Sequence, residues 1–345
     1  GNPPWISLSG KFGTDLYSDN VIQHLIKNFS GNTYMPNMYE YFVSQGISLT
    51  NDFGFFSFIV PDRLGYNKQF INLRKKILTE VKIHSLLYKA PFPGITADTL
   101  IFVFEKNKDP FPNAVKVSEF NKDVIIQNQR DILHNDKHLF IYFENQETFT
   151  LVKTIDKISN FRLGDICKTT SGFGGRSKLI TKKRINDDQI ITMKGESIGR
   201  YKFYYFFYFD FIKKNITGRT TDPYKLGFKP KILIRKTGDQ IIATYDETGF
   251  FPEQSLYFIY EKNTKASYFY ILGILNSKVL NYYFQAKLLT NKKSIAQVKK
   301  IDLDQLPFVI NDLEKRKNKR DHNQLTFLVK HMLELNKRTP QTPFE

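Results

Sequence analysis

Cysteine, long apolar runs and internal repeats are scarce in this 345-residue sequence, and each scarcity excludes a class of protein. A single cysteine, Cys167, permits no internal disulfide and no cysteine-rich zinc cluster. The longest apolar runs, 53–60 and 267–284, are too short or too polar for the roughly 20 apolar residues of a membrane span. The sequence contains no repeat of about 20 to 50 residues, so a solenoid is not expected. The amino terminus lacks the pattern of a secretion signal. We therefore expect a cytoplasmic protein without a membrane segment, built from about two domains.

Positive charge, in contrast, is plentiful and unevenly distributed. Lys and Arg total 51 against 34 Asp and Glu, which gives a net charge of +17. Residues 1–150 contain 15 residues of each sign, which leaves 36 basic and 19 acidic residues for 151–345. Codon bias towards Lys would enrich both halves alike, whereas a surface that neutralises a polyanion is confined to one module. The distribution predicts a nucleic acid partner for the second half, with an ordinary solvated surface as the alternative.

The first 105 residues alternate between helix-like and strand-like segments. Residues 38–45 and 70–78 have helical spacing, with Arg74 on the face expected to be exposed. Short apolar, β-rich runs separate them. Buried strands alternating with helices indicate a layered α/β sheet. The expected strands are 53–60, 81–87 and 99–104.

The pattern changes in the middle of the chain. Residues 106–159 are largely polar, with one expected strand at 139–143. Beyond them, short strands broken by glycine and two helices indicate a separate α+β module. The expected strands there include 231–234 and 256–260, and the expected helices are 268–284 and 324–336. We divide the chain into a first domain, a connector and a second domain at 1–110, 111–155 and 156–345.

The sharpest local pattern is Asn2-Pro3-Pro4-Trp5. Two successive prolines fix φ at two positions and remove two N–H donors, so backbone carbonyls face outward and the flanking Asn2 and Trp5 are held rigidly. The Asn2 carboxamide oxygen and a proline carbonyl can both accept from a planar exocyclic amine such as adenine N6, while Trp5 stacks on the heterocycle. An ordinary Asn-Pro-Pro turn is the alternative.

This motif resembles the (Asn/Asp/Ser)-Pro-Pro-(Tyr/Phe/Trp) sequence of amino-group DNA methyltransferases, in which Asn is typical of N6-adenine enzymes. The following segments resemble, in order, gamma-class enzymes of type IIG restriction-modification systems. Phe92 matches the phenylalanine that stacks on the far face of a flipped base. The matching segments of the catalytic domain are 37–42, 54–61, 70–78 and 92–99; those of the target-recognition domain are 163–166, 170–172, 195–201, 229–235, 275–278 and 306–307.

The resemblance implies a fold, a reaction and a set of site residues. The expected fold is a partial Rossmann-like methyltransferase domain of the α/β class, followed by an α+β target-recognition domain. The implied reaction transfers a methyl group from S-adenosylmethionine to N6 of an adenine flipped out of double-stranded DNA. Trp5 and Phe92 would hold the base, and Asn2 with the Pro3 carbonyl would bind its amino group.

One part of the family pattern is missing. Gamma-class enzymes carry a glycine-rich cofactor loop upstream of the Pro-Pro motif, whereas this sequence begins at that motif. The glycine-rich segment 171–175 has no strand-to-helix context and is expected to form a turn near DNA. We therefore expect a carboxy-terminal part of a larger enzyme, inactive alone. Its further partners would be the upstream part of the same polypeptide, which binds the cofactor, and a restriction nuclease domain or subunit.

Five basic residues of the second half lie in or beside glycine-bearing loops, where they can reach phosphates or bases. These expected DNA contacts are Arg176, Lys178, Arg200, Arg235 and Lys236.

Two other functions fit parts of the sequence. One is a DNA-binding specificity module without catalysis. The other is a Mg²⁺-dependent nuclease that uses Asp62, Glu80 and Lys82, although a helix-like segment interrupts this pattern. His134 and His138 have no third ligand at suitable spacing, so no metal site is expected there.

Overall fold

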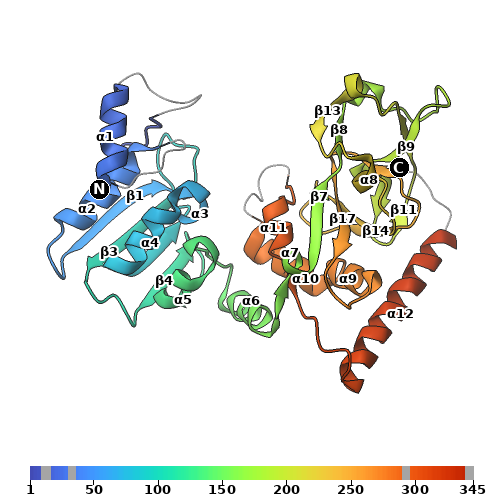
Figure 1. Ribbon diagram of the computed structural model, residues 1–345. Helices are drawn as coiled ribbons and strands as arrows, with labels where there is room; N and C mark the ends of the chain where they lie inside the picture. Colours follow the sequence, from blue (N-terminus) through green and yellow to red (C-terminus); the bar gives the residue numbers. More distant parts are fainter. Residues whose placement is uncertain (9–16, 30–35, 290–295, 339–345) are drawn as a thin grey trace. The chain divides into compact units, whose positions relative to one another are not determined.

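The computed structural model describes residues 1–8, 17–29, 36–289 and 296–338. The chain divides into two compact units, Gly1–Leu151 and Val152–Glu345, and both contain helices and strands (Figure 1). The architecture is therefore mixed α/β. In the described part of the chain, no helix combines the length and the apolar character that crossing a membrane requires.

The first unit is built on a mixed five-stranded sheet. Its strand order is β1-β3-β2-β4-β5, and β2 pairs with β4 in parallel while the other three pairings are antiparallel. The strands expected near residues 53–60, 81–87 and 99–104 are confirmed as β1, β2 and β3. The bounds are β1 Phe55–Pro61, β2 Val81–Tyr88, β3 Thr99–Lys106, β4 Ala114–Glu119 and β5 Ile125–Asn128.

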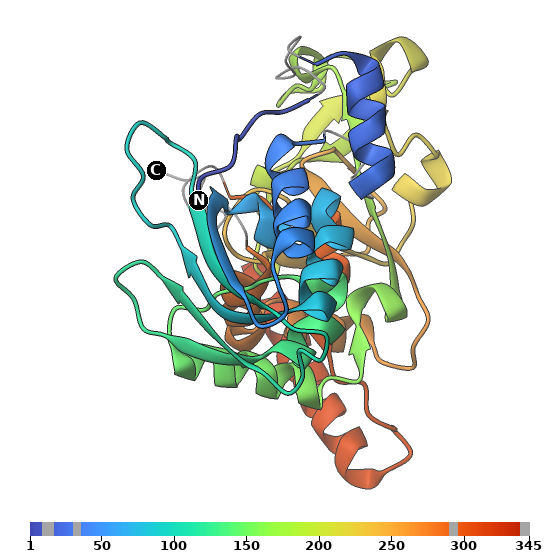
Figure 2. The same ribbon diagram turned by 90° about the vertical axis from the view of Figure 1, so that its left-hand side faces the viewer.

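Helices α2 and α4 lie together on one side of this sheet (Figure 2). Helix α2 begins after Asn37, whose backbone N–H donates to the Glu40 carboxylate at 2.8 Å. Tyr39, Val43 and Ile47 recur every four residues, so they form one buried face against the sheet. The helices of this unit are α1 Asp19–Phe29, α2 Met38–Leu49, α3 Arg63–Tyr66, α4 Ile71–Glu80 and α5 Gln129–His134, with short 3₁₀ turns η1 Lys68–Phe70 and η2 Asp136–His138; α6 Gln146–Ile158 crosses the division between the units.

Arg74 corrects one expectation, because its side chain is fully buried. Its guanidinium donates to the carbonyl oxygens of Leu64, Asn67 and Lys137 at 2.8 to 3.3 Å. These bonds replace the lost hydration, although burial lowers the pKa of Arg74 to about 10. A basic residue expected to face water therefore ties α4 to α3, to Asn67 and to η2.

The strand expected at 139–143 is absent, since this described segment has no sheet partner. Its backbone groups are bonded individually instead. The Phe140 N–H donates to the Gly65 carbonyl at 2.9 Å, and the Gln127 amide donates to the Ile141 carbonyl at 2.7 Å. The preceding part of the expected connector supplies β4, β5 and α5 to the first unit.

A four-stranded antiparallel sheet, in the order β15-β14-β17-β7, is central to the second unit. Side chains on β14 alternate between two hydrophobic cores: Ile232 and Ile234 enter one, and Leu233 enters the other. Both faces of the sheet are thus covered. The strands expected at 231–234 and 256–260 are confirmed as β14 and β17. The bounds are β7 Cys167–Ser171, β14 Lys231–Arg235, β15 Ala243–Asp246 and β17 Leu256–Lys262.

The first core is closed by helices and the second by smaller sheets. Helices α9 and α10 contribute to the first, and strands β8, β9 and β12 contribute to the second. The smaller strands are β6 Phe161–Arg162, β8 Phe173–Gly175, β9 Ile190–Met193, β10 Ile198–Gly199, β11 Lys202–Phe203, β12 Phe207–Phe209, β13 Ile216–Arg219, β16 Phe251–Pro252 and β18 Pro307–Phe308. The short helical turns are α7 Leu163–Ile166, η3 Ser177–Leu179, η4 Gly195–Ser197, η5 Lys213–Asn215, α8 Pro223–Leu226, the π-helix η6 Phe284–Leu288 and α11 Lys300–Asp304.

The helix expected over 268–284 is broken into α9 Tyr268–Leu275 and α10 Lys278–Tyr283. The Asn276 side chain exchanges two hydrogen bonds with the backbone of Ala243, at 2.9 and 3.0 Å. The Ser277 hydroxyl then caps α10 by accepting from the Leu280 N–H. The second expected helix is confirmed but longer, as α12 Arg316–Arg338.

Candidate functional site

The Asn2–Trp5 segment begins beside β1. The Gly1 nitrogen donates to the Ser57 carbonyl at 2.6 Å, and the Ile59 N–H donates to the Gly1 carbonyl at 2.9 Å. Gly1 lies opposite Phe58 and is bonded to the residues on both sides of it, Ser57 and Ile59. This hydrogen-bond pattern is that of two parallel strands. The backbone thus enters the Asn-Pro-Pro motif parallel to β1.

The segment is also fixed on its far side. Met38 N–H donates to the Ile6 carbonyl, and Leu8 N–H donates to the Pro36 carbonyl, both at 2.9 Å. The Trp5 indole N–H donates to the Ile59 carbonyl at 3.3 Å. The motif is therefore held between β1 and the start of α2.

The strand directions explain why Trp5 and Phe92 meet. Strands β1 and β2 are both antiparallel to β3, so their carboxyl ends lie at the same edge of the sheet. The Asn-Pro-Pro motif leaves that edge beside β1, and Phe92 lies in the loop that follows β2. The ring centroids of Trp5 and Phe92 are 6.0 Å apart, with planes inclined by 31°. The structure thus brings these two predicted residues together.

Asn2 and the prolines differ in exposure. Pro3 is buried, whereas Asn2 and Pro4 are exposed. Within the described residues, the Asn2 carboxamide makes no hydrogen bond, so its oxygen is available as an acceptor. The edge therefore offers an amide acceptor beside two aromatic rings.

The ring spacing limits what fits between Trp5 and Phe92. Atoms in contact lie about 3.5 Å apart, so a flat heterocycle between two rings needs about 7 Å. The observed 6.0 Å is smaller than this spacing. The Phe92 loop contains Gly94 with φ +76° and nothing within 4 Å of the position of an added Cβ. An outward shift of about 1 Å at Phe92 would admit a base.

The alternative nuclease residues do not converge. Asp62 follows β1 at the end of the sheet where Pro61 pairs with Thr99, whereas Glu80 and Lys82 flank Val81, which pairs with Lys106. Seven residues of β3 separate these ends, or about 23 Å at 3.3 Å per residue. Among the described residues, no group of three or more His, Cys, Asp or Glu side chains is arranged to hold a metal ion.

Asp62 lies at the same edge as Trp5 and Phe92, and the sequence did not assign it to this site. Its carboxylate accepts from the Tyr66 hydroxyl at 2.6 Å. Burial raises the pKa of Asp62, and the Tyr66 hydrogen bond opposes that rise. Its backbone N–H donates to the Asp98 carbonyl at 3.0 Å, which ties the end of β1 to the end of the Phe92 loop.

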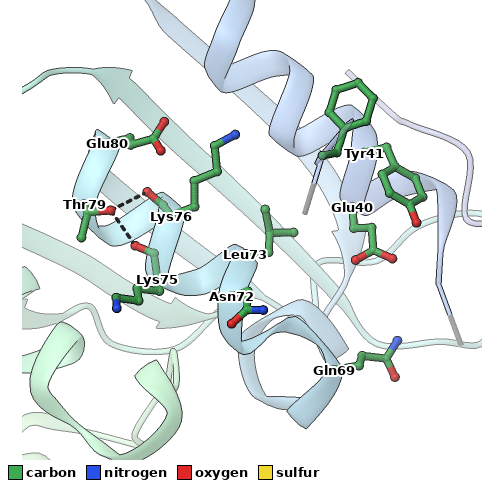
Figure 3. A pocket seen from close by; sticks show the side chains of 10 residues that line it. Glu40, Tyr41, Gln69, Asn72, Leu73, Lys75, Lys76, Thr79 and Glu80 are labelled. Carbon is green, nitrogen blue, oxygen red and sulfur yellow. Dashed lines mark hydrogen bonds between the residues drawn. The ribbon is translucent and has the colours of Figure 1, made fainter. Parts of the chain in front are cut away.

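A cavity of about 360 Å³ lies between α2 and α4 (Figure 3). Tyr41 and Glu40 face Leu73 and Asn72 across it. The Tyr41 hydroxyl is buried without a hydrogen-bond partner among the described residues, and burial raises its pKa. Neither Trp5 nor Phe92 lines this cavity.

Three of the five predicted DNA contacts have side chains that can reach a ligand. Arg176 is exposed in the turn between β8 and η3, and Lys178 is exposed within η3. Arg200 is half-buried after β10 and donates to the Gln240 carboxamide at 2.8 Å. Arg176 N–H also donates to the Asn215 carbonyl, which places this turn beside the start of β13.

Arg235 has a structural role in addition to the predicted one. Its Nε donates to the Gly195 carbonyl at 2.8 Å, and its Nη2 donates to the Ile198 carbonyl at 2.6 Å. The guanidinium therefore fixes the loop that leads to Arg200. Its contact with DNA stays a prediction.

Lys236, the fifth predicted residue, is half-buried and held in place. Its Nζ donates to the Ser171 hydroxyl at 2.6 Å and lies 4.4 Å from the centre of the Tyr257 ring. Burial and then the positive charge of Arg219 lower the pKa of Lys236 to about 8, against the opposite effect of Glu253. Arg219, which was not among the residues predicted from the sequence, therefore lies close enough to Lys236 to affect its charge. The preceding glycine, Gly218, was the available signal in the sequence.

The glycine-rich segment 171–175 belongs to β7 and β8. Gly172 is required there by close packing, because an added Cβ would lie 2.2 Å from the Pro252 carbonyl oxygen. The turn expected over 171–175 is therefore wrong, because the segment runs through two consecutive strands. His134 and His138 each bond a backbone carbonyl through Nδ1.

Two families match separate parts of the chain. Residues 1–91 match the Eco57I restriction-modification methylase family, and residues 191–308 match the TaqI-like C-terminal specificity domain. The first match includes the Asn2–Trp5 motif, and the second includes Arg200, Arg219, Arg235 and Lys236.

Individual relatives agree with these matches. A Methanocaldococcus jannaschii protein named as a type II restriction enzyme and methyltransferase is 29% identical over 323 residues, which cover 86% of this chain and 26% of that protein. The chain thus spans about a quarter of this relative. The type IIL restriction-modification enzyme MmeI, solved in complex with DNA, has a similar fold, with a TM-score of 0.57 at 10% identity over 99% of this chain and 50% of that one. The resemblance of this chain to restriction-modification methyltransferases with a target-recognition domain is thereby confirmed.

Proposed function

We propose that this chain forms the base-capturing and DNA-recognising part of a site-specific N6-adenine DNA methyltransferase in a restriction-modification system. The observation that carries the proposal is the meeting of Trp5 and Phe92 beside an exposed Asn2 at one edge of the sheet. An aromatic pair supplies stacking, and the neighbouring acceptors supply recognition of an amino group.

The direction of the backbone supports a partial Rossmann-like first domain. Gly1 is bonded as a residue parallel to β1, and the Asn-Pro-Pro motif follows at the carboxyl end. In open α/β sheets, ligands bind outside the carboxyl ends of strands. The position of the motif is the one that this rule favours.

The residues of this chain act by holding the substrate. Trp5 and Phe92 stack on the two faces of the extruded adenine. The Asn2 side-chain oxygen and the Pro3 carbonyl accept hydrogen bonds from N6, which fixes the direction of the nitrogen lone pair. Since Trp5 is itself bonded to Ile59, it provides the fixed side of the clamp, and Phe92 provides the adjustable side.

S-adenosylmethionine supplies the methyl group in the proposed reaction. The glycine-rich segment of this chain does not fit a cofactor loop, because it runs along β7 and β8. We therefore assign the cofactor site to the part of the related proteins that this chain does not span. The chain alone is expected to bind the cofactor weakly or not at all.

Double-stranded DNA is the proposed partner of the second unit, which holds the excess positive charge. A specificity module without catalysis remains the second candidate, supported by the match of residues 191–308 to a specificity domain. The nuclease that uses Asp62, Glu80 and Lys82 has no such support, because those residues lie at opposite ends of β3.

A methyl transfer assay separates the two candidates. The complete polypeptide would be incubated with tritiated S-adenosylmethionine and DNA, and the digested DNA would be analysed for N6-methyladenine. The proposal predicts incorporation into adenine at one sequence. Sequence-specific binding without any incorporation would leave only the specificity module.

A further inference from the structure

Arg219 is held in a backbone conformation that side chains rarely adopt. Its φ is +65°, and the preceding Gly218 has φ +133°. A bulky residue in the left-handed region is strained and persists only where its surroundings impose it. Strain of this kind is concentrated at functional sites.

The surroundings hold this backbone from two sides. Strand β13 pairs with β8, where Arg219 lies opposite the buried Phe173, and a bulge separates Ile216 from Gly218. The next residue, Thr220, shares a hydrogen bond of 3.0 Å with the Thr170 hydroxyl. The chain is therefore fixed before and after Arg219, while the Arg219 side chain is exposed.

Arg219 and Lys236 present two positive charges without a paired carboxylate. In the described part of the chain, the Arg219 guanidinium has no hydrogen bond or ion pair. The nearby Glu253 carboxylate is engaged elsewhere, since it accepts from the Ser255 N–H at 2.8 Å and the Ser255 hydroxyl at 2.6 Å. Two neighbouring positive charges repel each other. A ligand rich in hydrogen-bond acceptors that binds between them offsets this repulsion.

We propose that Arg219 and Lys236 form a specificity-determining pair that reads the acceptor edge of a guanine in the recognised DNA sequence. This inference rests on the proposed function, because it assumes that the second unit binds a defined DNA sequence. Guanine presents two adjacent acceptors, O6 and N7, in the major groove, and Arg or Lys bound to them is the commonest specific contact.

The fixed position of the Lys236 donor favours a base over a phosphate. Lys236 Nζ is held by Ser171 and by the Tyr257 ring, so it has little of the freedom of a surface lysine. The backbone at Arg219 is also fixed, which sets the direction in which its side chain leaves β13. Phosphate oxygens accept from many directions, whereas a base edge requires donors held in one geometry.

The test uses duplexes in which single guanines carry 7-deazaguanine, which lacks the N7 acceptor. The methylated sequence would first be identified in DNA treated with the complete polypeptide. Binding of wild type, Arg219→Gly and Arg219→Lys to each duplex would then be measured. Lys265→Ala is the matched control, since Lys265 is an exposed cation of the same unit and is not among the predicted DNA contacts.

In the wild type, one 7-deazaguanine position is expected to weaken binding tenfold or more. In Arg219→Gly the same replacement is expected to have no further effect, because the contact is already lost. Arg219→Lys should keep part of the affinity but lose preference for guanine at that position. Arg219→Gly should also keep or raise the melting temperature, because glycine relieves the strained φ.

Three results would overturn the assignment. The first is an equal loss for Arg219→Gly on every duplex with a salt slope reduced by about one unit, which marks a phosphate contact. The second is an unchanged guanine preference in Arg219→Gly and Lys236→Met, and the third is a wild-type protein that binds every 7-deazaguanine duplex as tightly as the unmodified one. The absence of any methylated sequence would instead refute the proposed function, so the two failures are distinguishable.

Discussion

In the first unit the candidate site residues Asn2 to Trp5 are consecutive in the sequence, whereas in the second unit Arg219 ends β13 and Lys236 follows β14. The charge differs as well: the first unit carries 15 basic and 15 acidic residues, and the second carries 36 and 19. A site for one extruded base needs few residues and little charge. A surface that grips a polyanion needs many cations from several elements.

The two units also stabilise a buried cation differently. Arg74 of the first unit is bonded to backbone carbonyls, whereas Lys231 of the second unit is 3.1 Å from the Asp246 carboxylate, with both side chains fully buried. Lys231 also donates to the carbonyls of Leu226 and Phe228. Removing one ion of a buried pair leaves the other ion without a compensating charge. Removing a guanidinium that is bonded only to carbonyl oxygens leaves no unpaired ion behind.

The largest stability effect is therefore expected for Lys231→Ala. The unpaired Asp246 should cost about 3–5 kcal/mol of the free energy of unfolding of the second unit. Chemical denaturation followed separately in the two units measures this loss. Lys168→Ala removes an exposed pair with Glu261 and serves as the control, with little expected cost because solvent screens this pair. Equal costs for both variants would contradict the role of the buried pair.

In the first unit, the largest functional effect is expected for Asn2→Ala. Removing one acceptor that acts in the transition state should lower the methylation rate about 10²- to 10³-fold in the complete enzyme. Duplex affinity should change little, since it depends mainly on phosphate contacts of the second unit. Asn20→Ala, in the exposed part of α1, is the matched control. A variant that keeps more than a tenth of the wild-type rate would remove Asn2 from the reaction.

Phe92→Ala tests the adjustable side of the clamp. Loss of one stacking partner costs about 1–3 kcal/mol per base. We expect weaker capture of the flipped base, visible as a changed fluorescence of 2-aminopurine at the target position. Phe120→Ala, at an exposed phenylalanine elsewhere in the first unit, should leave the signal unchanged. If Phe92→Ala also gives the wild-type signal, Phe92 does not touch the base.

Salt dependence tests the charge difference directly. The second unit alone is expected to bind duplex DNA with log K falling by about 0.9 per phosphate neutralised as log salt rises. The first unit, with balanced charge, should bind far more weakly and with a shallower slope. Lys178→Ala should flatten the slope of the second unit by about one unit. Equal slopes for both units would show that the excess charge is not a DNA surface.

The smallest expected effect is a pH dependence in the second unit. Lys236 has a pKa lowered to about 8, so it loses its proton as the pH rises through this value. DNA affinity should be nearly constant up to about pH 7 and fall as the pH rises through 8, because only the protonated amine donates with a positive charge. Lys236→Met should remove this fall while keeping the apolar stem. A wild-type affinity that is flat from pH 7 to about 9.5 would exclude Lys236 from the interface.

Helices and strands could be predicted where they depend on residues that are close together in the sequence. The strands β1, β2, β3, β14 and β17 follow from short β-rich runs, and α2 follows from its helical spacing. The prediction of one continuous helix over 268–284 was wrong because the Asn276 side chain bonds Ala243, a residue 33 positions away. Arg74 was misjudged for a similar reason, since the carbonyl of Lys137 that accepts from it is 63 positions away. Spacing along the chain does not reveal such partners.

The sequence by itself determined the Asn2–Trp5 motif, the segregation of charge and the likeness to a methyltransferase with a recognition domain, because each depends on residue identity and order. Only the tertiary structure decided that Phe92 meets Trp5, that Asp62 and Glu80 lie apart, and that Arg219 acts on Lys236. The physical reason is that strand order and direction set which loops share a sheet edge. These features arise from long-range pairing, which no local stretch of sequence encodes.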